Sequence, residues 1–368
     1  MADNPRGRKH AAVPRVRSGN PDVKLTREEF ERRIGERFYD PAFDAVRSQI
    51  DEVIGVAWDG YNEYRKSPRT RKAGPGFADP EFELPIEWLE ARQAIHEAQR
   101  AHDDPKSPRR VLLVSGAARS NQTCPGETSK TLRLVERAKH IFDAAGLECD
   151  VLDLSLLTAQ YGRQILPCKA CVSTAMPLCH WPCSCYPNHA MGQVNDWMNE
   201  LYPRWVAAHA VMIVTPVYWY QAPSVLKLMI DRLVCADGGN PDPTSTHGKK
   251  PEEAKKLEVE GWDFPRHLAG RLFAVFVHGD SAGTENLRRM LTDWLIDMKL
   301  EPAGGESAVD RYIGYMKSYA ASHDDFDEDT DVQEELRNVA RTLVDALVLR
   351  TAGAFTEPGT ALEEVRPK

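Results

Sequence analysis

The 368-residue chain has no long apolar run. Its apolar stretches, such as residues 210–214, are far shorter than the roughly 20 residues that a membrane-spanning helix needs. Basic residues near the amino terminus are not followed by an apolar segment, so we expect no secretory signal. These absences argue against a membrane partner and predict a cytoplasmic location.

Positive charge is also in deficit, since 47 Lys and Arg residues stand against 55 Asp and Glu, a net charge of −8. That balance argues against a nucleic-acid partner. The glycine spacings of a dinucleotide-binding Rossmann turn and of a P-loop are both missing, which disfavours those two nucleotide sites. Eight cysteines without an export signal favour reduced thiols or metal ligands over a disulfide framework.

The first third of the chain is expected to be helical. Residues 1–23 are rich in Pro, Gly and Arg and predict a disordered basic tail, with a nucleic-acid arm as the alternative. Residues 24–108 predict a helical extension without a convincing strand, packed on the main domain or on a partner subunit. Thr26 and Glu29 form a capping box, and Asp40 with Pro41 predicts the start of a longer helix. The apolar positions that follow recur at helical spacing: Phe43, Val46, Ile50, Val53, Ala57, Tyr61 and Tyr64.

Residues 109–350 alternate between apolar strands and amphipathic helices. Strands are predicted at 111–115, 149–154, 211–214 and 272–278, with a fifth near 302–307. Helices are predicted at 129–145, 192–208, 224–234, 284–298 and 332–349. This alternation predicts a doubly wound, five-stranded parallel α/β sheet. Within it lie a cysteine-rich loop at 167–187 and an insertion at 237–268, and residues 351–368 predict a flexible tail.

The segment after the first strand, residues 115–131, has the character of a phosphate-binding loop. Small residues allow close backbone approach, and a helix amino terminus with unbonded N–H groups favours anions. Ser129, Lys130 and Thr131 are therefore candidate phosphate ligands, with Arg119 as a second cationic group. Simple helix capping by the hydroxyls is the alternative.

Aromatic residues follow the third strand. Pro216 cannot donate to a strand ladder and should end the strand. Tyr218, Trp219 and Tyr220 would then stand at the carboxyl edge of the sheet, where open α/β sheets bind ligands. Such a wall suits a planar heterocycle such as a flavin, and capping of the sheet edge is the alternative. The turn at residues 278–283, after the fourth strand, should reach the same edge.

These loops together resemble the NADPH-dependent FMN reductase family of flavodoxin-like proteins. Residues 116–119 are similar to its phosphate loop, although Ala117 replaces a serine and residues 124–127 lengthen the loop. Residues 215–219, with Lys227, Asp231 and Arg232, are similar to its flavin-ring loop and following helix. The resemblance implies FMN, with NAD(P)H as co-substrate and the ring between residues 216–220 and 278–283. The implied cofactor-binding residues are Ser115, Ala117, Arg119, Ser129, Lys130, Thr131, Pro216, Val217, Tyr218, Trp219, Tyr220, His278, Gly279, Asp280 and Gly283. It also implies a homodimer or homotetramer with a small-molecule electron acceptor.

The cysteine-rich loop is a candidate metal centre. Four thiolates can hold zinc or a [4Fe–4S] cluster, and unmetallated thiols, including a redox pair, are the alternative. Iron–sulfur flavoproteins, which are relatives of this fold, carry a more compact cysteine motif at this place. The candidate ligands are Cys168, Cys171, Cys179, Cys183 and Cys185.

Residues 310–323 bring tyrosines and a histidine after the last strand. They are expected to cover the flavin pocket, to form a subunit contact or to pack as an exposed loop; the residues are Tyr312, Tyr315, Tyr319 and His323. The leading hypothesis is an FMN-dependent oxidoreductase in which no side chain is assigned as a catalytic acid or base. Two alternatives stay open: a non-catalytic flavin or iron–sulfur electron carrier, and a zinc-stabilised scaffold.

Overall fold

The computed structural model describes residues 13, 15–63, 69–186 and 196–356. Most of the two predicted tails, residues 1–23 and 351–368, lies outside the described residues. Tyr64 lies outside them as well. Within the described ranges, none of the helices is both long enough and apolar enough to cross a membrane. The chain forms two compact units, each built from three segments. Unit 1 comprises Met1–Arg92, Lys169–Asp196 and Gly239–Phe264, and unit 2 comprises Gln93–Cys168, Trp197–Gly238 and Pro265–Lys368.

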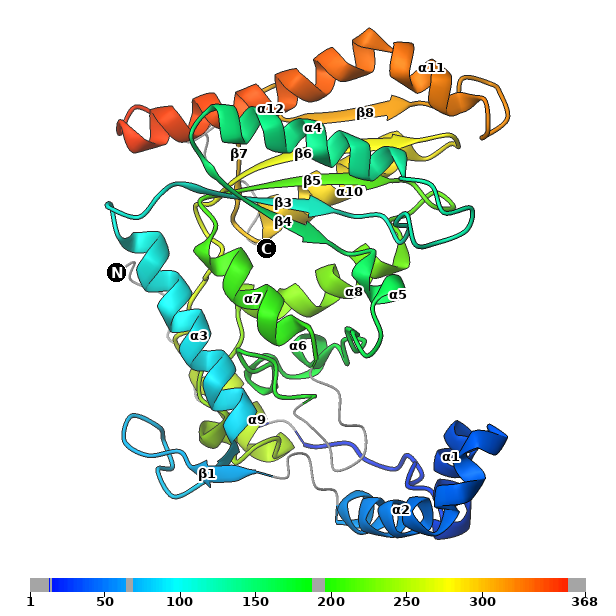
Figure 1. The fold of residues 1–368 in the computed structure, drawn as a ribbon. Helices are drawn as coiled ribbons and strands as arrows, with labels where there is room; N and C mark the ends of the chain where they lie inside the picture. The colour runs from blue at the N-terminus through cyan, green and yellow to red at the C-terminus, as the bar shows by residue number, and fades with distance from the viewer. Residues whose placement is uncertain (1–12, 14, 64–68, 187–195, 357–368) are drawn as a thin grey trace. The chain divides into compact units, whose positions relative to one another are not determined.

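Unit 2 contains a parallel sheet (Figure 1). Its strands follow the order β4 (Glu148–Asp153), β3 (Arg110–Ser115), β5 (Ala210–Pro216), β6 (Leu272–Gly279) and β7 (Glu301–Pro302), and β8 (Ala308–Tyr312) also pairs with β6. In chain order β4 follows β3, yet it lies at the edge of the sheet, on the side of β3 away from β5. The strand order therefore reverses between β3 and β5. This is the flavodoxin-like doubly wound order, so the predicted fold class is confirmed.

Helices cover both faces of this sheet, which explains why its central strands β5 and β6 are fully buried and almost wholly apolar. On one face lie α4 (Lys130–Ala144) and α12 (Thr330–Thr351), and on the other α7 (Met198–Ala207), α8 (Ser224–Leu233) and α10 (Thr284–Asp297) (Figure 1). The rings of Trp205 and Trp294, 6.1 Å apart, join α7 to α10. Shorter helices complete the unit at α5 (Leu156–Ala159) and α11 (Ser322–Glu328).

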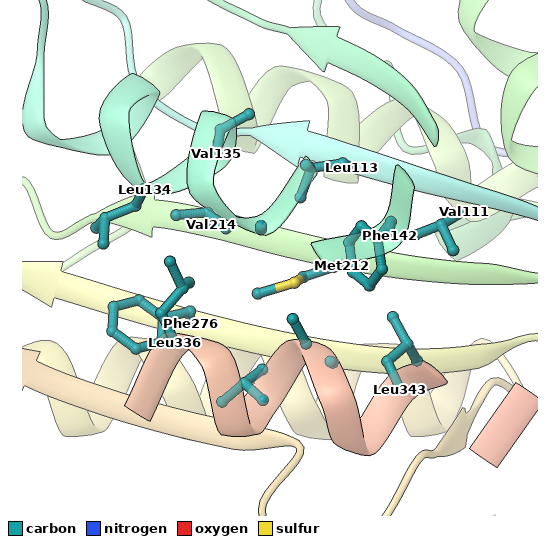
Figure 2. Close-up of a cluster of buried hydrophobic side chains, with 14 of the residues drawn as sticks. Val111, Leu113, Leu134, Val135, Phe142, Met212, Val214, Phe276, Leu336 and Leu343 are labelled. Atoms are coloured by element: carbon teal, nitrogen blue, oxygen red, sulfur yellow. The ribbon is translucent and has the colours of Figure 1, made fainter. Parts of the chain in front are cut away.

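The core beneath α4 and α12 follows the alternation of side chains along each strand. Figure 2 shows Leu113, Met212 and Phe276 of the strands in one buried cluster with Phe142 of α4 and Leu343 of α12. All five side chains are fully buried. Burial of one such side chain stabilises a fold by about 1.5–3 kcal/mol, so this layer fixes where the strands end and their loops begin.

The fifth position of the sheet differs from the prediction. The sequence predicts one strand near residues 302–307, whereas the structure has β7 ending at Pro302 and β8 beginning at Ala308. Gly304 and Gly305 interrupt the strand, because glycine is unfavourable in extended structure, and the Ser307 N–H closes a turn on the Gly304 carbonyl at 3.1 Å. The sheet thus has six strands rather than five.

Unit 1 is mainly helical but contains an antiparallel pair of short strands. Its elements are α1 (Arg27–Gly35), α2 (Arg47–Asn62), β1 (Thr70–Lys72), β2 (Glu83–Pro85), the start of α3 (Ile86–Asp103), α6 (Cys171–Thr174) and α9 (Pro251–Glu260). The prediction of no strand in this region was therefore wrong. The sequence contains no strand signal here because all three residues of β1 are exposed and show no alternation of apolar side chains.

Two helix starts in unit 1 follow the capping signals in the sequence. Thr26 accepts a hydrogen bond from the Glu29 N–H at 3.2 Å. Asp40 caps a 3-10 turn at Pro41–Val46 that precedes α2, rather than α2 itself. The buried face of α2 contains Ile54, whereas the predicted Val53 is exposed.

Candidate cofactor-binding site

A cavity of about 210 Å³ lies in unit 2 at the carboxyl edge of the sheet. The loops after β3, β5, β6 and β8 meet here, because parallel strands end on the same edge. The lining residues are Ala117, Arg119, Ser129, Lys130, Thr131, Pro216, Val217, Tyr218, His278, Gly279, Asp280, Ile313 and Tyr319. Three of these loops, those after β3, β5 and β6, are the ones that the sequence predicts to meet at this edge.

The start of α4 faces this cavity. Ser129 is the N-cap and accepts a hydrogen bond from the Leu132 N–H at 3.2 Å, so its hydroxyl does serve as a cap. The loop between β3 and α4 begins at Gly116 and passes close to β5. Only glycine fits there, since an added Cβ would lie 2.5 Å from the Thr215 Oγ1. The loop therefore brings backbone close to a helix terminus that favours anions.

Arg119 has hydrogen-bonding capacity left over. Its Nη1 donates to the Tyr319 hydroxyl at 2.6 Å, and its guanidinium lies 5.0 Å from the centre of that ring. Its Nε and Nη2 atoms are buried, yet they have no hydrogen-bond partner among the described residues. Unpaired buried donors are uncommon in proteins. Their presence beside the cavity is what a bound phosphate would satisfy.

Lys130 is buried, and its ammonium is already engaged. It donates to the Ser322 hydroxyl at 2.6 Å and to the Ile313 carbonyl at 3.2 Å. Burial lowers the pKa of Lys130, with the charge of Asp280 acting in the opposite direction. Lys130 therefore both adds positive potential to the cavity and holds the segment after β8 against α4.

His278 and Thr131 form a fixed pair at the floor of the cavity. The His278 Nε2 and the Thr131 Oγ1 are 2.8 Å apart. Burial, assisted by the charge of Lys130, lowers the pKa of His278 to about 3. The imidazole is thus neutral at physiological pH, and a protonated His278 is not available as an acid in this protein.

The aromatic segment after β5 contributes one ring to the cavity rather than three. Tyr218 and Gln221 exchange two backbone hydrogen bonds, each 2.9 Å, which close a tight turn. Trp219 and Tyr220 have φ angles of 45° and 67° at its tip. Trp219 is 92% exposed and Tyr220 58% exposed, and neither lines the cavity that Tyr218 lines.

Four predicted cofactor-binding residues do not line the cavity: Ser115, Trp219, Tyr220 and Gly283. Ser115 is buried within β3. Ile313 does line it, and no signal in the sequence singled that residue out. Tyr319 also lines it, which favours pocket covering among the three expectations for that segment.

Gly283 instead supports the aromatic turn from behind. Its φ is +107°, and an added Cβ would lie 2.7 Å from the Tyr220 Cα. We expect Gly283→Ala to lower the free energy of unfolding by about 2–4 kcal/mol, because both the backbone angle and the contact are unfavourable for alanine. Urea unfolding followed by circular dichroism measures this. Gly305→Ala is the matched control, since a Cβ there meets nothing within 4 Å; equal stabilities of the two variants would contradict the prediction.

The cysteine-rich loop brings thiols together in unit 1. The Cys171 and Cys185 sulfurs are 3.6 Å apart, and the Lys249 ammonium lies 2.8 Å from the Cys185 sulfur. Hydrogen bonds from Cys171 and Cys183, and then from Lys249, hold the pKa of Cys185 well below its usual range against the opposing effect of burial. Cys168 belongs to unit 2.

No disulfide joins any of the eight cysteines, all of which are among the described residues. Within the described ranges, no group of three or more Cys, His, Asp or Glu side chains has the arrangement of a metal site. The assignment of Cys168, Cys171, Cys179, Cys183 and Cys185 as metal ligands therefore stays a prediction.

The sheet order defines a flavodoxin-like α/β protein, and its cavity lies at the carboxyl edge, where open α/β sheets bind ligands. Residues 109–313 match the NADPH-dependent FMN reductase family. Since the match spans more than half of the 368 residues, the chain belongs to that family.

One curated relative is the iron–sulfur flavoprotein of Methanosarcina thermophila, 26% identical over 125 residues. The alignment covers 34% of this chain and 52% of the relative, so the chain spans about half the length of that protein. Among solved structures, RosB with a bound flavin intermediate is 14% identical, with 71% of this chain and 91% of RosB covered and a TM-score of 0.44. The NAD(P)H:quinone oxidoreductase of Methanothermobacter marburgensis is 15% identical, with 64% and 94% covered and a TM-score of 0.36.

Proposed function

We propose that the protein is an FMN-dependent oxidoreductase that takes hydride from NADPH or NADH and passes electrons to a quinone, a free flavin or another small acceptor. The observation that carries the proposal is the pair of unpartnered Arg119 donors beside the amino terminus of α4, at the edge where the strand order reverses. Membership of the NADPH-dependent FMN reductase family supports it.

The residues around the cavity have distinct proposed roles. Arg119 and the start of α4 would hold the FMN phosphate by charge and N–H donation. Tyr218 would lie against the ring system, and Gly279 and Asp280 would border it. FMN, when bound, supplies the hydride and electron-transfer chemistry. The neutral His278 keeps the floor of the cavity uncharged, and burial raises the pKa values of Tyr218 and Tyr319, so both hydroxyls stay protonated.

Absorption spectroscopy tests the proposal. The full chain is incubated with FMN, separated from excess, and then mixed anaerobically with NADPH or NADH in a stopped-flow instrument. We expect retained flavin bands that bleach when reduced nicotinamide is added. Retained flavin without bleaching would support a non-catalytic electron carrier instead, and a protein that retains no flavin would contradict any FMN-based function.

A second candidate function is electron transfer through a cysteine-bound centre. It is favoured by the similarity to an iron–sulfur flavoprotein and by the contact between Cys171 and Cys185. For this function we propose an iron–sulfur cluster as the occupant, because zinc has no redox chemistry and could only stabilise the loop. Iron, sulfide and zinc analysis of anaerobically purified protein separates them. A colourless protein containing zinc would favour the zinc-stabilised scaffold, and absence of all three would contradict a metal centre.

We also propose a cytoplasmic homodimer or homotetramer whose neighbouring subunit completes the pocket. The exposed Trp219 and Tyr220 rings beside the cavity support this, since exposed aromatic side chains are enriched at interfaces. Sedimentation over a range of protein concentrations tests it, and a monomer at every concentration would contradict it.

A further inference from the structure

A second cavity of about 250 Å³ lies in unit 2 at the amino ends of the strands. It is lined by His102, Arg109, His209, Gly270, Leu347, Arg350 and Thr351. His209 directly precedes β5, which has seven residues and ends beside the first cavity. At about 3.3 Å per residue, the two cavities lie roughly 20 Å apart on opposite edges of one sheet.

The hydrogen bonds of His209 determine which ring nitrogen carries the proton. Its Nδ1 accepts from the Arg110 backbone N–H at 3.1 Å, so this nitrogen is unprotonated. Burial, together with the charge of Arg109, lowers the pKa of His209 to about 4, so the ring is neutral at physiological pH. A neutral ring with a bare Nδ1 must carry its proton on Nε2.

That Nε2–H donor is buried. An interaction with the His102 backbone opposes the fall in the His209 pKa, yet no described group meets this nitrogen at full hydrogen-bonding distance and angle. The His209 side chain is 8% exposed and lines the cavity. The ring cannot turn freely, because it stacks on His102 with centroids 4.7 Å apart, and the His102 Nδ1 is held 3.0 Å from the Ala208 carbonyl. A fixed donor of this kind calls for an acceptor from outside the chain.

Positive charge surrounds the donor. Arg109 lines the cavity, and no ion pair engages it in the part of the chain that the structure describes. Arg350 also lines it; one side of its guanidinium binds Glu301 and the Gly270 carbonyl, while its buried Nε has no partner among the described residues. Arg271, close enough to lower the pKa of His209, adds a third charge.

The nearby carboxylates leave this charge only partly balanced. Glu301 pairs with Arg350, and Glu148 pairs with Arg110 outside the lining set. Asp103 acts on His102 and on Arg271. Arginines thus outnumber the carboxylates around the cavity, and no carboxylate lines it.

We propose that this cavity is an anion site for a small oxyanion, the phosphate or carboxylate group of a metabolite, held by the His209 Nε2–H and the Arg109 and Arg350 guanidinium groups. Planar guanidinium groups match the oxygens of phosphate and carboxylate, and the neutral imidazole adds a directional donor. The site is separate from the proposed flavin cavity and does not depend on FMN binding there.

Titration of the full chain with inorganic phosphate, at constant ionic strength, tests the proposal by the NMR signals of the His209 ring, assigned from His209→Phe. We expect saturable shifts of these signals, and a dissociation constant about tenfold higher in Arg109→Gln. Arg100→Gln removes an equal charge from an exposed position on α3 and should change binding by less than about twofold. Arg119→Gln should leave the His209 response intact, which separates this site from the flavin cavity.

Acetate titration distinguishes the two sources of the oxyanion. A response to phosphate alone assigns a phosphate-bearing ligand, and a response to acetate alone assigns a carboxylate. No response to either anion would overturn the proposal. Equal weakening by Arg109→Gln and Arg100→Gln would mean an adventitious ion only, and would overturn it as well.

Discussion

Replacing Arg119 with glutamine is expected to raise the dissociation constant for FMN by about 10- to 100-fold. A hydrogen bond to a charged group contributes about 1.5–3 kcal/mol, and the Arg119 Nε and Nη2 are the donors that no other described group satisfies. Quenching of flavin fluorescence on binding measures the change.

Riboflavin is the decisive control for this prediction, because it has the ring system of FMN without the phosphate. Its affinity should be the same for the parent protein and for Arg119→Gln. Arg289→Gln, a matched change at an exposed position on α10, should leave FMN affinity unchanged. Equal losses for FMN and riboflavin would show that Arg119 does not serve the phosphate.

Acidification is expected to destabilise the fold between about pH 6.5 and pH 3. Burial lowers the pKa to about 3 in His278 and His267, and to about 4 in His102 and His209. In this window the unfolded chain binds protons that the folded chain does not, so stability is full above the unfolded pKa and falls as pH decreases. His278 alone accounts for roughly 3–5 kcal/mol of this loss.

Urea unfolding near pH 7 and near pH 4 tests the acid prediction. His278→Gln retains a polar contact for Thr131 and should reduce the difference in stability between the two pH values. His140→Gln, at an exposed position on α4, should leave that difference as it is in the parent. If His278→Gln and the parent lose the same free energy on acidification, His278 is not a source of the effect.

The sheet could be predicted from the sequence because burial on both faces leaves an unambiguous pattern. Residues 210–214 and 272–277 are apolar throughout, and both segments are central strands. The loops after β3, β5 and β6 were predictable because each follows such a strand. Gly116, Pro216 and Gly279 mark where these strands end. The strands β1 and β8 are partly or wholly exposed, and for them the pattern fails.

The orientation of side chains in the loops could not be predicted. Trp219 and Tyr220 adopt positive φ angles, which bulky residues rarely do. No sequence pattern therefore predicts this backbone conformation. The wall of three rings is therefore one ring and an exposed pair. Similarly, the Lys249 ammonium meets Cys185 across 64 residues of sequence, and no local spacing encodes that contact.

The buried Lys130 has a thermodynamic consequence for ligand binding. Its bonds to Ile313 and Ser322 hold the Tyr319 side of the cavity in place within the isolated chain. That wall is ordered when the protein folds, so an arriving ligand does not have to immobilise it. Binding then loses little conformational entropy at this wall, and the affinity reflects the contacts themselves.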